Sequence, residues 1–181
     1  KEEFAQTHPA WFSENLATGC FTARGDAKEY EALLNQYASV AIKGMKISSA
    51  TTFIVSQPDN CGFCGCYNCG VASAELGGAS GTMVKFCNDL ARKITAWFDT
   101  EEGMPYDRDF KLVFLAYQSC AAAPTSDIKC DDNVGVYIAF DSYRSSYGLE
   151  EDVHNKSLYN TVIDWQKKTN LFVFWIYDVN F

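Results

Sequence analysis

The sequence predicts an α/β fold, namely a partial (β/α)8 TIM-like barrel that contains roughly half of the parallel strands with their flanking helices. Four short apolar runs, at 51–57, 111–118, 134–140 and 171–177, have the length and composition of buried strands. Segments with helical periodicity alternate with most of them, which is typical of a parallel sheet. Because a closed barrel needs about 250 residues, we expect the 181 residues to be a single segment of a barrel in a longer chain.

The first long helix is predicted from Asp26 to about Lys43. Asp26 is a favourable N-cap residue, and Gly44 is expected to end the helix. Apolar side chains recur on one face at spacings of three and four residues, at Tyr30, Leu33, Leu34, Tyr37, Ala38 and Ala41. The strand 51–57 and a cysteine-rich loop follow.

A second helix is predicted over about 82–98, after a glycine-rich break at 77–81 in which Ser80 would be the N-cap. Its apolar face carries Met83, Phe86, Leu90, Ile94 and Trp97. Two strands, 111–118 and 134–140, come next. A helix at about 156–168 then leads into the last strand, 171–177.

Composition excludes two classes of partner. The net charge of -8 argues against nucleic acids, because binding phosphates requires basic patches. No apolar run approaches the roughly 18 residues of a membrane span, so we expect no membrane insertion. Aromatic residues make up 15% of the chain, which suits a site that binds carbohydrate but does not by itself indicate one.

Polar side chains follow each predicted strand. If the strands are parallel, their carboxyl ends share one rim, where barrels of this type carry their active sites. Glycoside hydrolysis commonly uses two carboxylates, so the candidate catalytic residues are Asp59 and Asp141, with Asp178 as the third. The candidate substrate-binding residues at the same rim are Gln57, Asn60, Tyr117, Gln118, Tyr143, Arg144 and Tyr177. Alternatively, these aspartates cap the following turn or helix.

The loop after the first strand contains Cys61, Cys64, Cys66 and Cys69. The last three, with either Cys61 or the distant Cys20, have a spacing that resembles a zinc knuckle and would form a four-thiolate site. A second interpretation is that the cysteines form disulfides in an exported protein, and Cys120 and Cys130 would then be a possible pair. In a third, some are buried thiols, which is the best interpretation of Cys87.

Five stretches of the chain resemble a known family. They are Phe4-x-x-x-His8-Pro9-x-Trp11-Phe12, Cys20-Phe21-Thr22, Ser56-Gln57-x-Asp59-Asn60 with the cysteines after it, Ser80-Gly81 with Phe86 and Asn88, and Leu115-Ala116-Tyr117 with Trp175-x-Tyr177-x-x-Asn180-Phe181. Together they resemble a bacterial family of unknown function found in large exported proteins linked to polysaccharide use. The core of that family resembles the barrels of α-glucuronidases and β-hexosaminidases.

The resemblance implies several further expectations. It selects Cys20, Cys64, Cys66 and Cys69 as the set that binds zinc or forms disulfides, and it matches Asp59 to a strand-end aspartate of the family. It also implies a secreted or cell-surface location by bacterial export, with the remaining domains of a larger chain as partners. Many members have an aspartate where this chain has Ile176, and a Glu-Cys-Cys segment near the position of Asp141 that is absent here.

We therefore expect a carbohydrate-active protein, a glycoside hydrolase-like barrel segment that acts on a polysaccharide or oligosaccharide. No cofactor is expected for the chemistry, but a structural zinc is possible. The alternatives are a non-catalytic glycan-binding module, which Ile176 favours, and a structural domain stabilised by metal or disulfides.

Overall fold

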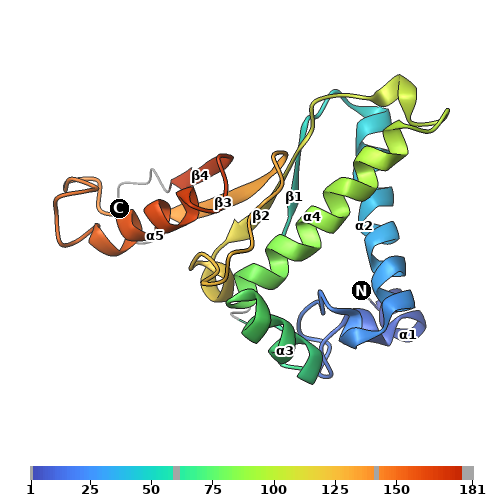
Figure 1. Cartoon of the computed structure of the whole chain (residues 1–181), viewed down its shortest axis with the longest axis horizontal. Helices are drawn as coiled ribbons and strands as arrows, with labels where there is room; N and C mark the ends of the chain where they lie inside the picture. The colour runs from blue at the N-terminus through green and yellow to red at the C-terminus, as the bar shows by residue number, and fades with distance from the viewer. Residues whose placement is uncertain (1, 59–61, 141–142, 177–181) are drawn as a thin grey trace.

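The computed structural model describes residues 2–58, 62–140 and 143–176 (Figure 1). Its centre is a sheet of four strands, β1 (Thr52–Val55), β2 (Lys111–Ala116), β3 (Val134–Phe140) and β4 (Phe172–Ile176). The strands follow one another in the order β1-β2-β3-β4, and each pairs with its neighbour in parallel. This confirms the predicted parallel α/β sheet. Sequential parallel strands also form the wall of a (β/α)8 barrel, so the arrangement is consistent with part of one.

Helices flank this sheet. The α-helices are α1 (Glu2–Thr7), α2 (Ala27–Ile47), α3 (Tyr67–Leu76), α4 (Ala79–Phe98) and α5 (Lys156–Gln166). Short 3-10 turns are η1 (Pro9–Trp11), η2 (Ala23–Gly25), η3 (Met104–Tyr106) and η4 (Gln118–Cys120). In Figure 1, α2 and α4 come together at their C-terminal ends and diverge toward their N-terminal ends, and the two helices are in contact. None of the helices in the described ranges is long and apolar enough to cross a membrane.

The start of α2 is as predicted, but its end is not. Asp26 is the N-cap, and its side chain accepts hydrogen bonds from the N–H groups of Lys28 and Glu29. The prediction that Gly44 ends the helix is wrong, because α2 continues to Ile47. At Gly44 the helix passes close to β1, where a Cβ would lie 3.1 Å from a ring carbon of Phe53. The glycine therefore serves helix–strand packing.

The segment between β1 and α4 was only partly predicted. Helix α3, which begins at Tyr67 within the cysteine-rich region, was not foreseen. The expected N-cap Ser80 is also wrong, since Gly78 is the N-cap of α4 and Ser80 lies buried inside the helix. Gly77 and Gly78 have φ values of 77° and 124°, a region that favours glycine, and they turn the chain sharply from α3 into α4.

The two faces of the sheet differ. One face packs on the helices: the ring centroids of Phe114 and Trp165, from β2 and α5, are 5.7 Å apart. By strand alternation and register, the opposite face carries Ile54, Val113, Leu115, Tyr137, Ala139, Val173 and Trp175. Ile54 is 53% exposed and Trp175 is 44% exposed. The hydrophobic core thus lies between the sheet and the helices, and parts of the opposite face remain open.

Candidate functional site: a cysteine cluster and the carboxyl rim of the sheet

Four cysteine side chains from distant parts of the sequence lie together. The Sγ atoms of Cys20, Cys64, Cys66 and Cys69, the cysteine cluster below, are all within 4.8 Å of one another. Cys20 Sγ is 3.6 Å from Cys69 Sγ and 3.8 Å from Cys66 Sγ. Cys20, Cys64 and Cys69 are buried. These are the four residues that the family resemblance selected as the set that binds zinc or forms disulfides.

Helix α3 positions two of these cysteines. Cys66 is its N-cap, and its Sγ accepts a hydrogen bond from the N–H of Cys69 at 3.5 Å. The same bond closes the first turn of the helix and turns both thiols to the same side. Sulfur here replaces the hydroxyl or carboxylate oxygen of a usual cap, so the N-cap position of α3 carries none of the residues that commonly mark the start of a helix.

A tight turn presents Cys20 to the loop. Residues Ala23, Arg24 and Gly25 all have positive φ, between 42° and 83°. This turn brings the N–H of Arg24 to 3.2 Å from Cys20 Sγ. The carbonyl of Arg24 in turn accepts a hydrogen bond from the side-chain amide of Asn68. Backbone and side-chain donors therefore fix the two segments against each other around the sulfurs.

Two of the sulfur separations match those found around a tetrahedral metal. Four thiolates at the usual Zn–S length of about 2.3 Å lie about 3.8 Å from one another, close to the 3.6 and 3.8 Å found here. A disulfide would require a separation of about 2.05 Å. The four cysteines can therefore hold a metal ion of the kind that prefers sulfur.

The pKa values of the cluster thiols also favour a bound cation. Hydrogen bonds from the Cys69 thiol, the Thr22 hydroxyl and the Arg24 N–H lower the pKa of Cys20 to about 4, although burial opposes this shift. The hydrogen bond to Cys20, together with burial, raises the pKa of Cys69. Burial also raises the pKa of Cys64 to about 11. Without a cation the cluster favours one thiolate, and further thiolates at this distance need a positive charge.

The other described cysteines lie apart from the cluster. Cys87 and Cys120 are buried and Cys130 is half-buried. Each of the seven cysteines in the described ranges is a free thiol, including Cys120 and Cys130, which the sequence suggested as a pair. Cys61 lies outside the described residues.

A pocket of about 210 Å³ opens at the carboxyl ends of the strands. Its lining, called the rim pocket below, consists of Gln57, Pro58, Leu115, Tyr117, Gln118, Ala139 and Trp175. Leu115, Ala139 and Trp175 belong to the sheet face opposite the helices. The pocket thus lies where a TIM-type barrel has its active site.

Hydrogen bonds and backbone strain shape this pocket. Gln57 donates from Nε2 to Cys120 Sγ at 3.0 Å, which joins the loop after β1 to the turn after β2. Gln118 has φ of 48°, a conformation that residues other than glycine rarely adopt and that recurs at functional sites. An aromatic ring, a phenol and two amides therefore surround one small cavity.

The structure brings some of the predicted rim residues together. Gln57, Tyr117 and Gln118 line the rim pocket, as a shared rim requires. Tyr143 and Arg144 are not among its lining residues; Tyr143 packs on Phe140, and the backbone of Arg144 is hydrogen-bonded to Asn155. The predicted residues Asp59, Asn60, Asp141, Tyr177 and Asp178 lie outside the described residues.

Trp175 was not foreseen as a site residue. The sequence treats 171–177 as one buried strand, but β4 exposes Trp175 at 44% and places it in the rim pocket. Its ring centroid is 5.7 Å from that of Tyr137, on the same face of the sheet. Strand alternation could have assigned Trp175 to that face, but which face lacks helices is decided by tertiary packing.

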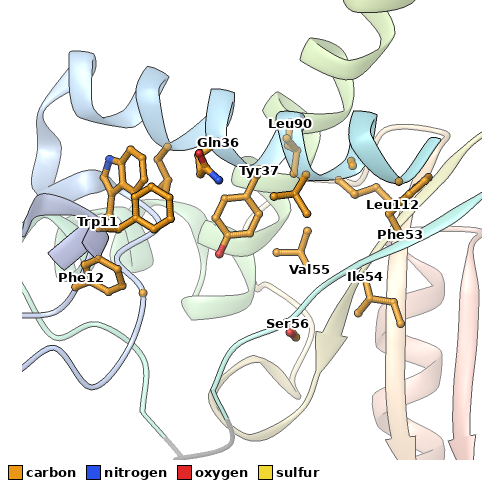
Figure 2. Close-up of a pocket in the computed structure, with 16 residues that line it drawn as sticks. Trp11, Phe12, Gln36, Tyr37, Phe53, Ile54, Val55, Ser56, Leu90 and Leu112 are labelled. Atoms are coloured by element: carbon orange, nitrogen blue, oxygen red, sulfur yellow. The ribbon is translucent and has the colours of Figure 1, made fainter. Parts of the chain in front are cut away.

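A pocket on the other side of β1 from β2 has a different character. It has a volume of about 520 Å³ and lies between α2, the N-terminal segment and β1, which is the edge strand of the sheet. Figure 2 shows Trp11, Tyr37 and Val55 directed into the same space, with Phe53 and Leu112 at its far end. Almost all of its lining is apolar, so it suits a packed hydrocarbon surface better than a polar ligand.

Neither a search of curated proteins nor a search of solved structures found a match to this chain. A match to a family described as "Domain of unknown function (DUF4838)" covers residues 1–181. It spans all of the elements described above, including the cysteine cluster and the rim pocket. The chain belongs to this DUF4838 family.

Proposed function

We propose that this chain binds carbohydrate at the carboxyl rim of its sheet, as a segment of a glycoside hydrolase-like barrel. The observation that carries the proposal is the rim pocket, in which Trp175 and Tyr117 lie beside the amides of Gln57 and Gln118. Indole and phenol rings offer flat apolar surfaces with a polar edge, and amides both donate and accept hydrogen bonds. Sugars present apolar faces ringed by hydroxyls, so this combination suits them.

The proposal is tested by binding, with a matched pair of variants. Trp175 and Phe174 are neighbours on β4, each 44% exposed, but they lie on opposite faces of the sheet. We expect Trp175→Ala to weaken the binding of a neutral oligosaccharide at least tenfold, about 1.4 kcal/mol, and Phe174→Ala to leave it unchanged. Isothermal titration against a glycan panel measures both. Equal effects of the two substitutions would contradict a site at the rim.

Catalysis would require two carboxylates at the same rim. Asp59, Asp141 and Asp178 are the candidates, because they follow β1, β3 and β4 in sequence. If the chain hydrolyses glycosides, Asp59→Asn should lower the turnover by several orders of magnitude while the unfolding transition stays unchanged. Unchanged turnover would remove Asp59 from the mechanism. Binding of glycans without any turnover in the wild type would favour the alternative of a glycan-binding module.

We further propose that the cysteine cluster holds a structural zinc ion. Its support is that the four sulfurs lie within 4.8 Å of one another, and that two of their separations, 3.8 and 3.6 Å, are close to those around a tetrahedral zinc. All four ligand positions would be filled by protein, which is typical of structural and not catalytic zinc. The ion would tie the N-terminal segment to the loop between β1 and α3, and so hold that loop beside the rim.

Metal analysis and thiol titration of the native protein test this second proposal. We expect about one zinc per chain, with the four cluster thiols protected from alkylation until a chelator is added. No metal together with disulfides among these cysteines would overturn it, and would favour the disulfide interpretation. Export of the protein to the cell surface is also part of the proposal. It is supported by the resemblance of the sequence to exported proteins and is tested by fractionating cells that produce the full-length protein.

The remainder of the barrel is proposed as a further partner. The apolar pocket beside the open edge of β1 and the exposed Ile54 on the helix-free face are surfaces that neighbouring strands would cover. A longer fragment of the parent protein should therefore bury Ile54, which hydrogen exchange in β1 would report.

A further inference from the structure

A polar groove beside the cysteine cluster is a second candidate binding site. Two adjoining hollows, of about 220 and 330 Å³, share Ser13, Asn15 and Gly65 in their linings. The groove runs between the turn at 13–18 and the cysteine-rich loop. Its remaining lining residues are Glu14, Ala17, Thr18, Gly62, Phe63, Cys66 and Tyr67.

The turn on one side of the groove is held by its own hydrogen bonds. Ser13 Oγ donates to Asn15 Oδ1 at 2.7 Å and accepts from the N–H of Thr18 at 3.1 Å. Asn15 Oδ1 also accepts from the N–H of Ala17. Asn15 lines both hollows, and its side-chain amide can donate to an outside acceptor. The groove is thus preorganised on this side.

Thr18 supplies the observation that points to a ligand. It lines the groove, its residue is 6% exposed, and its hydroxyl has no hydrogen-bond partner among the described residues. An unpaired buried hydroxyl is unfavourable, so such groups in native proteins call for a partner. The oxygen itself is buried behind the surface of the groove, so a ligand hydroxyl would meet it only where the turn at 13–18 shifts.

The other side of the groove presents an aromatic ring. Tyr67, the first residue of α3, is 83% exposed. An exposed tyrosine beside a polar hollow offers a flat surface for stacking with a hydrogen-bonding edge. The lining contains no Lys or Arg and one carboxylate, Glu14, so it does not suit an anion. Its polarity likewise does not suit a hydrocarbon.

We infer that this groove binds a neutral polyhydroxylated ligand and forms a second sugar subsite of the protein. The inference rests on the proposed carbohydrate function. One loop connects the two sites: Gln57 and Pro58 line the rim pocket, and Gly62 and Phe63 line the groove. The cysteine cluster fixes the groove, because Cys66 belongs to both. An oligosaccharide long enough to occupy both sites gains affinity from each.

Two substitutions probe the groove with little risk to the fold. Thr18→Val keeps the shape of the side chain and removes a hydroxyl that bonds to nothing described, so it should leave the melting temperature unchanged or raise it. Tyr67→Ala alters a side chain that is 83% exposed. We expect the dissociation constant of a neutral hexasaccharide to rise about fivefold for Thr18→Val and about tenfold for Tyr67→Ala. Met104→Ala, an exposed apolar position in η3, is the control.

The probes are cellohexaose, xylohexaose, mannohexaose and maltohexaose, measured by isothermal titration and by saturation-transfer NMR. Weaker binding by both groove variants and normal binding by Met104→Ala would support the inference. If Trp175→Ala weakens binding but the groove variants do not, the groove is not a subsite and the proposed function survives. If the groove variants weaken binding and Trp175→Ala does not, the rim proposal fails and the groove stands. If none of these sugars binds the wild type, both are overturned.

Discussion

Cys66 joins secondary structure to the cysteine cluster within a single side chain. Its Sγ caps α3 by accepting from the N–H of Cys69, and it lies 3.8 Å from Cys20 Sγ. An N-cap contributes typically about 1 kcal/mol, whereas a thiolate ligand to zinc contributes a share of a much larger binding free energy. A serine at this position can cap the helix but cannot supply a thiolate to zinc, so the two contributions can be measured separately.

We therefore expect Cys66→Ser to lose the metal but keep most of the capping, and Cys66→Ala to lose both. The alanine variant should be about 1 kcal/mol less stable than the serine variant when both are compared without metal. Metal analysis and urea unfolding measure the two effects. Cys130→Ser, a half-buried thiol outside the cluster, should retain the metal. Metal loss in that control would mean that the cluster does not define the site.

Two helix glycines allow a second test at the residue scale. A Cβ at Gly81 would lie 1.9 Å from the carbonyl oxygen of Leu76, while a Cβ at Gly70 would have no other atom within 4 Å. Gly81→Ala should thus lower the free energy of unfolding by about 2 kcal/mol or more, because backbone must move. Gly70→Ala, within α3, should raise it by up to about 1 kcal/mol. Urea unfolding of both variants checks the sign of each change.

In α2, a local signal sets where the helix begins, whereas packing against another element accounts for the glycine near its end. Asp26 sets its start through hydrogen bonds to the N–H groups of Lys28 and Glu29, at 2.8 and 3.1 Å. Its end is set elsewhere, since Gly44 fits against Phe53 and the helix continues for another three residues. Gly44 resembles a helix-ending glycine in the sequence, but in the structure it lies within the helix where β1 approaches closely.

Removing the N-cap of α2 should destabilise the protein modestly. Asp26→Ala leaves two N–H groups of the first turn without their acceptor, and we expect a loss of about 1 kcal/mol. Asp26→Asn should lose much less, because the amide oxygen can still accept. Thermal and urea unfolding distinguish the two variants. Equal losses for both would show that the charge of Asp26, and not its capping oxygen, is the stabilising feature.

At the scale of the whole molecule, the cysteine cluster links the N-terminal segment to the connection after β1, which the sheet does not do. Cys20 belongs to the N-terminal segment, and Cys64, Cys66 and Cys69 belong to the connection between β1 and α3. The hydrophobic core between the sheet and helices α2, α4 and α5 does not depend on these sulfurs. Stability should therefore be unequal across the chain, with the cluster region as a local unit.

Chelation of the metal should loosen this unit and spare the core. We expect faster hydrogen exchange at 13–25 and 62–69 after zinc is removed, with β2 and β3 still protected. Mass spectrometry of exchange with and without chelator measures this. Global unfolding would instead indicate that the metal supports the entire fold, and unchanged exchange would argue that the thiols alone hold the segments together.

From the sequence alone, the four strands, the parallel sheet and most helix positions were predicted correctly. The periodicity and length of an apolar run indicate whether a segment is buried on one face or two. The continuous apolar run at 134–140 predicted a strand with the bounds that β3 has, Val134–Phe140. The cysteine set was also named from the sequence, with the family resemblance selecting Cys20. The bounds of α2 and α4 and the existence of α3 were missed, because they depend on contacts between distant segments. The short helix α1 was not predicted either.

The sequence by itself thus determined the types of most elements and the sheet class and, through the family resemblance, a set of thiols able to bind metal. The tertiary structure alone decided that the four thiols converge and that Trp175 lies in a pocket with Tyr117. It also decided that Tyr67 lines a hollow adjoining that of Thr18, whose hydroxyl has no partner among the described residues. The physical reason is the range of the interactions. Hydrophobic periodicity and capping act over a few residues, whereas sites form where loops far apart in the chain meet, and their meeting is set by packing of the whole fold.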